Sequence, residues 1–223
     1  MKLKLIGKGG PWIFRLAVLL SALNSVEPTQ DVDLRSIASS QGFRMLGAEN
    51  GDMFGYATSQ AGDVNGDGIA DIIIGAQGAD RPGKTNVGIA YVVFGHSSSS
   101  LFSVSMDFLT MSTGYDTGFR LFGVDGVTNS GNSVDTAGDV NGDGVDDMII
   151  SSLYALSGSG RTNGGISYVV FGRKVTSPSN AFSDIELSTI ASGSPIGFRI
   201  LGGAAFDTCG TYVSHAGDVN GDG

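Results

Sequence analysis

The sequence has little cysteine, proline or positive charge. Its 223 residues include one cysteine, Cys209, so no internal disulfide can form and cysteine says almost nothing about the redox compartment. Lys and Arg number 13 against 22 Asp and Glu, which gives a net charge of −9. This balance argues against a nucleic-acid partner, because phosphate binding needs a surplus of basic side chains. Only 5 prolines accompany 36 glycines without a Gly-X-Y period, which excludes collagen and predicts many tight turns.

Long apolar runs are also scarce. Charged residues make up 16% of the chain and hydrophobic residues 41%, so the chain is not a disordered tail. The N-terminus places basic residues before an apolar stretch at 16–23, the order of a secretory signal. This segment could instead be the remnant of an earlier strand and loop, or a mispredicted start. We expect residues 1–27 to be a signal peptide, an anchor or an unstructured leader. Nothing else in the sequence approaches the ~20 apolar residues that span a bilayer.

Internal repetition is the most informative feature of the chain. The octapeptide Ala-Gly-Asp-Val-Asn-Gly-Asp-Gly begins at Ala61, Ala137 and Ala216, which are 76 and 79 residues apart. Two further markers follow the same period. The first is Gly-Phe-Arg-(Met/Leu/Ile)-(Leu/Phe)-Gly, beginning at residues 42, 118 and 197, and the second is Tyr-Val-Val-Phe-Gly, beginning at residues 91 and 168. Residues 28–223 are therefore predicted to contain two complete repeats and a truncated third.

Each repeat is predicted to consist of short strands. Residues 72–74 and 148–150 are continuous apolar runs, typical of strands buried on both faces. Residues 91–94 and 168–171 are β-rich runs flanked by glycine. The pattern predicts an all-β fold, a partial β-propeller built of four-stranded antiparallel blades. A β-solenoid fits less well, because its rungs are far shorter than these repeats.

The acidic loop of each repeat has the spacing of a metal-binding loop. Oxygen-bearing side chains stand at loop positions 1, 3, 5 and 9, and a backbone carbonyl at position 7 can add a further oxygen. The predicted ligands are Asp63, Asn65, Asp67, Ile69 and Asp71 in the first loop, and Asp139, Asn141, Asp143, Val145 and Asp147 in the second. Asp218, Asn220 and Asp222 begin a third loop, which the sequence leaves incomplete.

The donor set favours calcium held in a structural role. Hard oxygen ligands in a flexible shell suit Ca²⁺ better than Mg²⁺, and neither complete loop contains the His or Cys typical of zinc sites. Three carboxylates brought together without a cation repel one another, whereas a divalent ion reduces their net charge to about −1. The competing interpretation is a solvated turn, which Asn, Asp and Gly also favour. An EF-hand is a poor match because its position 12 needs Glu, where this chain has Ile74 and Ile150.

Other chemical motifs find little support. Residues 78–85 match the phosphate-loop pattern G-x-x-x-x-G-K-[ST]. That chemistry requires a following helix, whereas the residues after position 85 predict a strand, so the segment is predicted to be a hairpin loop. No G-x-S-x-G elbow occurs, and His96 and His215 stand in unrelated contexts. We therefore predict no catalytic residues and no organic cofactor.

The repeats resemble the FG-GAP repeats of the integrin α-subunit propeller and its bacterial relatives. The resemblance rests on Phe54-Gly55, the Asp-x-Asn-x-Asp-Gly-x-x-Asp loops and Ile74-Gly75-Ala76, and it covers about residues 30–223. It implies seven blades in a closed ring, with calcium in a hairpin loop of a blade. The sequence departs from the pattern at 130–131, 151–153 and 209–210, without altering the predicted ligands. Two and a half repeats cannot close such a ring, so the chain is expected to be a fragment or to be completed by other chains.

The resemblance implies a calcium-binding, non-catalytic module for recognition or adhesion outside the cell or at its surface. Its partner would be a protein bound by the propeller loops. Contact with a membrane would occur only through an N-terminal anchor or through segments outside this sequence. The alternative is an accessory propeller of a secreted, phospholipase D-like enzyme whose catalytic domain lies outside the sequence. A third hypothesis is a truncated gene product without a function of its own.

Overall fold

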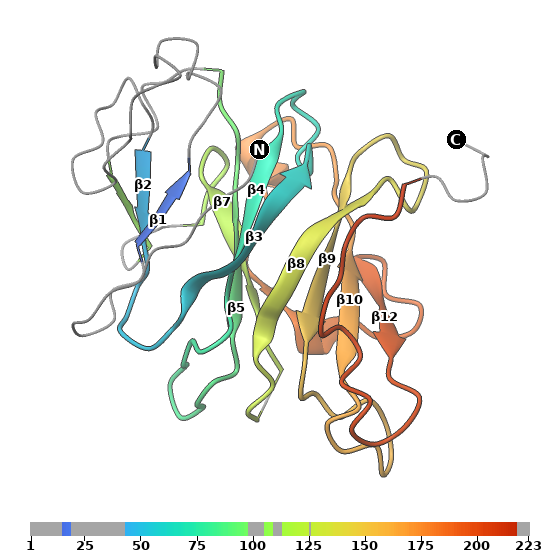
Figure 1. Cartoon of the computed structure of the whole chain (residues 1–223). Coiled ribbons are helices and arrows are strands. Elements are labelled where there is room, and N and C mark those ends of the chain that lie inside the picture. Colours follow the sequence, from blue (N-terminus) through green and yellow to red (C-terminus); the bar gives the residue numbers. More distant parts are fainter. Residues whose placement is uncertain (1–14, 19–42, 98–104, 109–112, 125, 218–223) are drawn as a thin grey trace, which may run out of the picture.

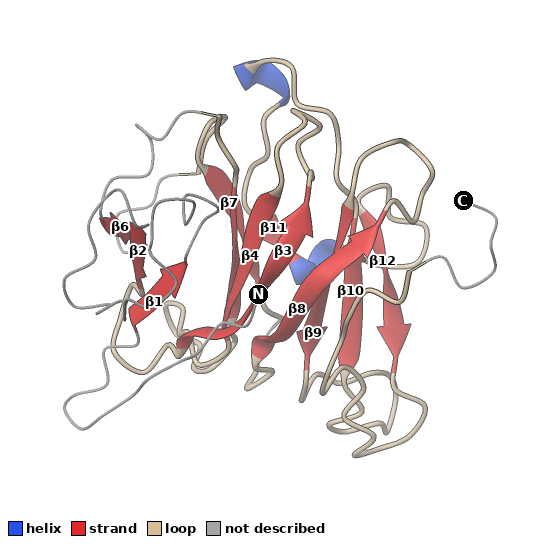
Figure 2. Ribbon diagram, turned by 45° about the horizontal axis from the view of Figure 1, so that its top comes forward, coloured by secondary structure: helices blue, strands red, loops and turns tan. Residues whose placement is uncertain are grey.

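The chain folds into β-sheets. A computed structural model describes residues 15–18, 43–97, 105–108, 113–124 and 126–217. In this part of the chain the helical elements are two single 3₁₀ turns, η2 (Pro178–Asn180) and η3 (Leu187–Thr189). All other regular elements are strands (Figure 2). The predicted all-β class is therefore confirmed.

Two sheets stand side by side as neighbouring blades, each with four antiparallel strands (Figure 1). The first sheet has the short strand β11 (Ile185–Glu186) as a fifth member at its edge. The first blade has the strand order β3-β4-β5-β7. Its strands span Phe54–Gly62, Asp71–Ala76, Ile89–Val93 and Gly118–Phe122. The second blade has the strand order β8-β9-β10-β12. Its strands span Ser130–Gly138, Asp147–Ser152, Ile166–Val170 and Gly197–Leu201. The predicted four-stranded blades are thus confirmed as two consecutive units of a partial propeller.

Each blade takes its fourth strand from the repeat that follows. The Gly-Phe-Arg marker of the second repeat forms β7 and pairs with β5 of the first, with Tyr91 opposite Arg120. The same marker of the third repeat forms β12 and pairs with β10, with Tyr168 opposite Arg199. Consecutive repeats are therefore joined by backbone hydrogen bonds as well as by side-chain packing.

A third, smaller sheet has the order β1-β2-β6. Its strands span Arg15–Val18, Phe43–Leu46 and Ser105–Asp107. β2 carries the first copy of the Gly-Phe-Arg marker and pairs with β1 in the antiparallel manner in which β7 pairs with β5. β1 lies within the segment predicted as a leader. Residues 1–14 and 19–42 are outside the described part, so that prediction remains open.

The main hydrophobic core lies between the two blades. Ile73 and Val92 of the first blade meet Met148 and Tyr168 of the second, and all four are buried. On the opposite face of the first blade, a second cluster forms around Tyr91 and includes Ile74, Phe54 and Phe108. β5 is consequently buried at every position. The apolar runs at 72–74 and 148–150 lie in β4 and β9, where residues on both faces are buried except for one half-buried residue in each run, as predicted.

The blades approach so closely at one point that only glycine fits. A Cβ atom added to Gly75 in β4 would lie 1.9 Å from the carbonyl oxygen of Gly131 in β8. Gly131 itself has a φ of +81°, in the region that favours glycine. Gly75 belongs to the Ile-Gly-Ala segment of one repeat, and Gly131 occupies the Phe-Gly position of the next. These motif glycines therefore set the distance between blades.

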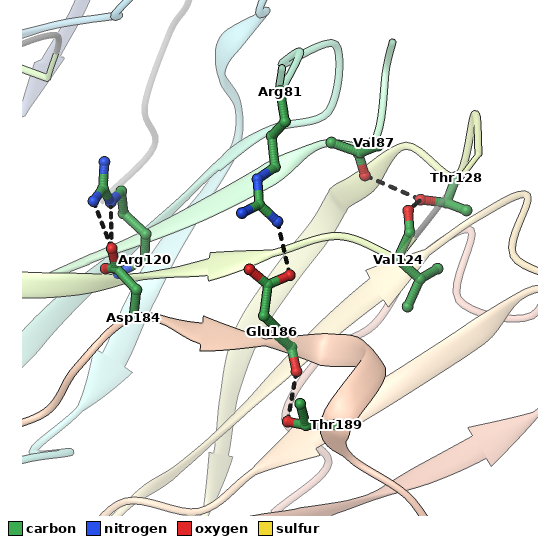
Figure 3. Close-up of polar contacts among 8 residues, drawn as sticks. All are labelled: Arg81, Val87, Arg120, Val124, Thr128, Asp184, Glu186 and Thr189. Carbon is green, nitrogen blue, oxygen red and sulfur yellow. Dashed lines mark hydrogen bonds and ion pairs between the residues drawn. The ribbon is translucent and has the colours of Figure 1, made fainter. Parts of the chain in front are cut away.

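A short strand from the second repeat pairs with the outer edge of the first blade. β11 (Ile185–Glu186) pairs in parallel with β7. Beside it, Asp184 accepts hydrogen bonds from the backbone N–H of Arg120 at 2.9 Å and from its guanidinium Nε at 3.0 Å. Arg81 donates to the carboxylate of Glu186 at 2.7 Å (Figure 3). Its guanidinium also stacks over the ring of Phe122. The two ion pairs hold this strand in register.

The Arg120–Asp184 pair should stabilise the fold in a pH-dependent way. Burial raises the pKa of Asp184, but hydrogen bonds from Arg120 and Thr113 outweigh it and hold the pKa below the ordinary value. The pair's contribution is therefore complete above the ordinary carboxyl pKa of about 4 and is lost as the pH falls through the lowered value. Because both side chains are partly exposed, R120Q should cost about 1–2 kcal/mol at pH 7.

Urea unfolding of the native chain and of R120Q between pH 7 and pH 3 measures this difference. R81Q is the matched control, because the Arg81–Glu186 pair is more exposed on its acidic side and should contribute less than 1 kcal/mol. A difference for R120Q that grows as the pH falls would contradict the assignment.

Candidate metal-binding loops

The two predicted metal loops occupy equivalent places in the two blades. The first, residues 63–71, joins β3 to β4, and the second, residues 139–147, joins β8 to β9. Each loop turns through two glycines with positive φ: +71° and +88° at Gly66 and Gly68, and +74° and +84° at Gly142 and Gly144. A residue with a Cβ is strained at such angles, so the glycines allow the tight curl of each loop.

The acidic side chains of the first loop curl inward and accept hydrogen bonds from the loop backbone. Asp63 at position 1 accepts from the N–H of Asp67 at 3.0 Å and of Gly68 at 2.7 Å, one bond on each carboxylate oxygen. Asn65 accepts from the N–H of Asp67 at 2.9 Å, and Asp67 accepts from the N–H of Ile69 at 2.8 Å. Positions 1, 3 and 5 thus face the interior of one turn.

The aspartate at position 9 lies at the end of the first loop, where β4 begins. Asp71 is buried at the start of β4 and accepts from the N–H of Val64 at 2.9 Å and of Gly95 at 2.8 Å. Burial, helped by the negative charges of Asp67 and Asp63, raises the pKa of Asp71 to about 7, although the two amide hydrogen bonds act in the opposite direction. The loop therefore holds a carboxyl group that lacks a compensating positive charge.

The second loop repeats the main hydrogen bonds of this arrangement. Asp139 accepts from the N–H of Asp143 at 3.0 Å and of Gly144 at 2.8 Å, while Asp143 accepts from Val145 at 3.0 Å. Asn141 accepts from the N–H of Asp143 at 2.9 Å. Asp147 at position 9 accepts from the N–H groups of residues 140 and 172, each at 2.9 Å. Burial raises the pKa of Asp147, as it does for its counterpart in the first loop.

The donor set fits calcium by its chemistry, although the side chains now face the loop amides. Across the described ranges, no three His, Cys, Asp or Glu side chains are grouped closely enough to hold a metal ion as they stand. Each carboxylate offers about four acceptor positions, so the loop amides leave acceptor capacity for a cation. All predicted side-chain donors are oxygen atoms, the ligand type that Ca²⁺ takes. The carbonyl ligands Ile69 and Val145 stay predictions, and Asp218, Asn220 and Asp222 lie outside the described residues.

The loops differ in how far the neighbouring blade covers them. Val64 and Asn65 of the first loop are buried, at 0% and 5% exposed. Their equivalents in the second loop, Val140 and Asn141, are exposed, and Val140 is 50% accessible. Asp146 of the second loop accepts a hydrogen bond from the backbone of the first. The ligand spacing did not single out Asp146, but the acid at position 8, where the first loop has Ala70, was a visible signal.

The segment that matches a phosphate loop is a connection between strands. Arg81 and Lys84 form an isolated antiparallel bridge within it, and the chain continues into β5. No helix follows whose N-terminal amides could hold phosphates. The hairpin-loop prediction is confirmed. In the described residues, no helix has the length and apolar character needed to cross a membrane.

Comparison with known proteins supports the interpretation of the repeats. Residues 54–93, which span β3, the first metal loop, β4 and β5, match the FG-GAP repeat family model. The chain carries an FG-GAP repeat. The paired motif glycines that set the blade distance thus belong to this FG-GAP repeat and to the equivalent segment of the following unit.

Two curated relatives share FG-GAP similarity over most of the chain. Integrin alpha-PS2 of Drosophila melanogaster is 28% identical over 175 residues, which cover 74% of this chain and 11% of the integrin. Phosphatidylinositol-glycan-specific phospholipase D of Bos taurus is 29% identical over 168 residues, which cover 75% of this chain and 17% of the phospholipase. The chain therefore spans less than a fifth of the length of either relative.

Proposed function

We propose that this chain is a calcium-stabilised, non-catalytic propeller module that recognises another protein outside the cell or at its surface. The observation that carries the proposal is the pair of loops in consecutive blades, which arrange the same oxygen donors with the same hydrogen bonds. A solvated turn would not need to repeat these hydrogen bonds in the next blade. Calcium would neutralise the carboxylates that burial and mutual repulsion now disfavour in their charged form.

The chain's own residues would hold the ion and order the loop around it. Asp63, Asp67 and Asp71 would supply carboxylate oxygens to the ion in the first loop, and Asp139, Asp143 and Asp147 would do so in the second. When bound, calcium supplies positive charge and coordination, so its role is structural. Similarity to an integrin α subunit supports a recognition or adhesion role, for which the loops joining the strands of each blade offer a binding surface.

An NMR titration of the metal-free chain with calcium chloride tests the metal proposal. The amide signals of Gly68 and Gly144 report on the two loops separately, because each amide donates to a predicted ligand. We expect both to shift, with Kd values on the order of 10⁻⁴–10⁻³ M or tighter. D67N should abolish the response of the first loop and D143N that of the second. D80N is the control, because it removes one exposed carboxylate from the connection that follows β4, at the opposite end of that strand from the first metal loop.

If neither the Gly68 nor the Gly144 amide signal shifts on addition of calcium, the metal proposal is overturned. An equal response to magnesium chloride would contradict the assignment of calcium.

An accessory module of a secreted enzyme is the second candidate function. It is favoured by the similarity to phosphatidylinositol-glycan-specific phospholipase D over 75% of this chain. The coding sequence that flanks residues 1–223 distinguishes the two candidates. A hydrolase domain encoded in the same reading frame would favour the accessory role, and further repeats without such a domain would favour the recognition module.

A further inference from the structure

The first metal loop lies against the second blade. The segment that follows β10 runs along it: the N–H of Arg173 donates to the carbonyl of Val64 at 3.0 Å, and the N–H of Val175 donates to the carbonyl of Asn65 at 2.7 Å. Both bonds involve backbone at loop positions 2 and 3, adjacent to predicted ligands. The burial of Val64 and Asn65 follows from this contact.

Asp146 adds a charged contact at the point where the chain enters the first loop. Its carboxylate accepts from the backbone N–H of Asp63 at 2.8 Å, and its own N–H donates to the carbonyl of Asp63 at 3.3 Å. These two bonds hold both the N–H and the carbonyl of Asp63, the predicted ligand at position 1, against Asp146. The fit is tight, because a Cβ added to Gly62 would lie 2.4 Å from the Asp146 carboxylate.

The second loop lacks such a contact in the described part of the chain. Residues 139–144 are exposed, although the hydrogen bonds within the loop match those of the first. Within the described residues, the two loops therefore share donors and internal geometry, but only the first is held by Asp146. The second loop can serve as an internal reference when the Asp146 contact is removed.

We propose that Asp146 is a positioning residue that pre-orders the first loop across the blade interface, so that this loop binds calcium more tightly than it would without that contact. The inference rests on the proposed function. A loop already held in its bound form loses less conformational freedom on binding, and this raises affinity without a new ligand. Coupling between two sites is reciprocal, so calcium in the first loop would in turn strengthen the docking of the second blade.

The calcium titration followed at Gly68 and Gly144 tests the inference loop by loop. We expect D146A to weaken calcium binding by the first loop about tenfold, the size of one charge-assisted hydrogen bond. The affinity of the second loop should change less than twofold. D146N keeps an acceptor oxygen for the N–H of Asp63 and should lie between the native chain and D146A.

A70D is the matched variant, because it places a carboxylate at position 8 of the first loop, where Asp146 stands in the second. If position 8 acted only through its charge on its own loop, A70D would tighten the first loop and D146A would weaken the second. Under the cross-blade mechanism, D146A weakens the first loop instead.

Several outcomes would overturn the inference while leaving the proposed function intact. They are an unchanged calcium affinity of the first loop in D146A, and a loss on D146A that is confined to the second loop. If neither loop binds calcium, the proposed function and the inference fail together. Should D146A not fold, D146N still decides, because a first loop that binds calcium as tightly in D146N as in the native chain would contradict a role for the Asp146 carboxylate.

Discussion

Replacing Gly75 with alanine is expected to destabilise the chain by about 3 kcal/mol, at the upper end of overpacking effects. The added Cβ would lie 1.9 Å from the carbonyl oxygen of Gly131, and that atom belongs to the backbone of the neighbouring blade. A flexible side chain could move aside, but here one blade must shift against the other. The shift would also disturb the buried contacts between Ile73 and the second blade. Urea unfolding of the native and G75A chains measures the cost.

Gly203→Ala is the control for the glycine prediction. Gly203 does not have a positive φ, and a Cβ there would meet only the Asp207 carboxylate at 3.4 Å, an ordinary contact. The free energy of unfolding of G203A should therefore stay within about 0.5 kcal/mol of that of the native chain. If G75A were as stable as G203A, the blade spacing would not depend on the close approach of Gly75 and Gly131.

Removing calcium should lower the melting temperature by about 10–20 °C relative to the chain in ~10 mM calcium. With a Kd of ~10⁻⁴ M, each occupied loop stabilises the folded chain by about 2.7 kcal/mol, and two loops by about 5 kcal/mol. A domain of this size loses about 2–4 °C for each kcal/mol. Thermal unfolding followed by circular dichroism, in calcium and in excess EGTA, measures the difference.

Two comparisons make the chelation result specific. Magnesium at the same concentration should restore much less of the melting temperature, because Mg²⁺ demands a more rigid octahedral shell. The D67N/D143N double variant should melt at the same temperature with and without calcium. Identical melting curves of the native chain in calcium and in EGTA would refute a structural role for the ion.

Most of the fold could be predicted because its signals are local and repeated. The apolar runs at 72–74 and 148–150 indicated strands buried on both faces, and the structure places them in β4 and β9. The repeat period did not reveal which strands share a blade. A period fixes the length of a unit but not where its sheet begins, so the transfer of β7 and β12 to the preceding blade became visible only in the pairing.

The metal loops show the same division between local and distant information. The ligand spacing lies within nine residues, and in each complete loop the side chains at positions 1 and 3 accept hydrogen bonds from the loop's own backbone. The contact of Asp146 with Asp63 joins residues 83 positions apart, which spacing within a loop cannot disclose. Glycine shows a similar limit, because its abundance predicted turns, whereas Gly75 is needed within a strand for close approach.

The transfer of the fourth strand has a consequence for synthesis on the ribosome. β5 is complete at Val93, but its partner β7 ends only at Phe122. The first sheet therefore emerges with its apolar third strand, β5, paired to β4 on one edge and open on the other. At about 5–20 residues per second, that edge stays open for a few seconds. We expect this interval to be the period in which the nascent chain is most prone to aggregate and most in need of a chaperone.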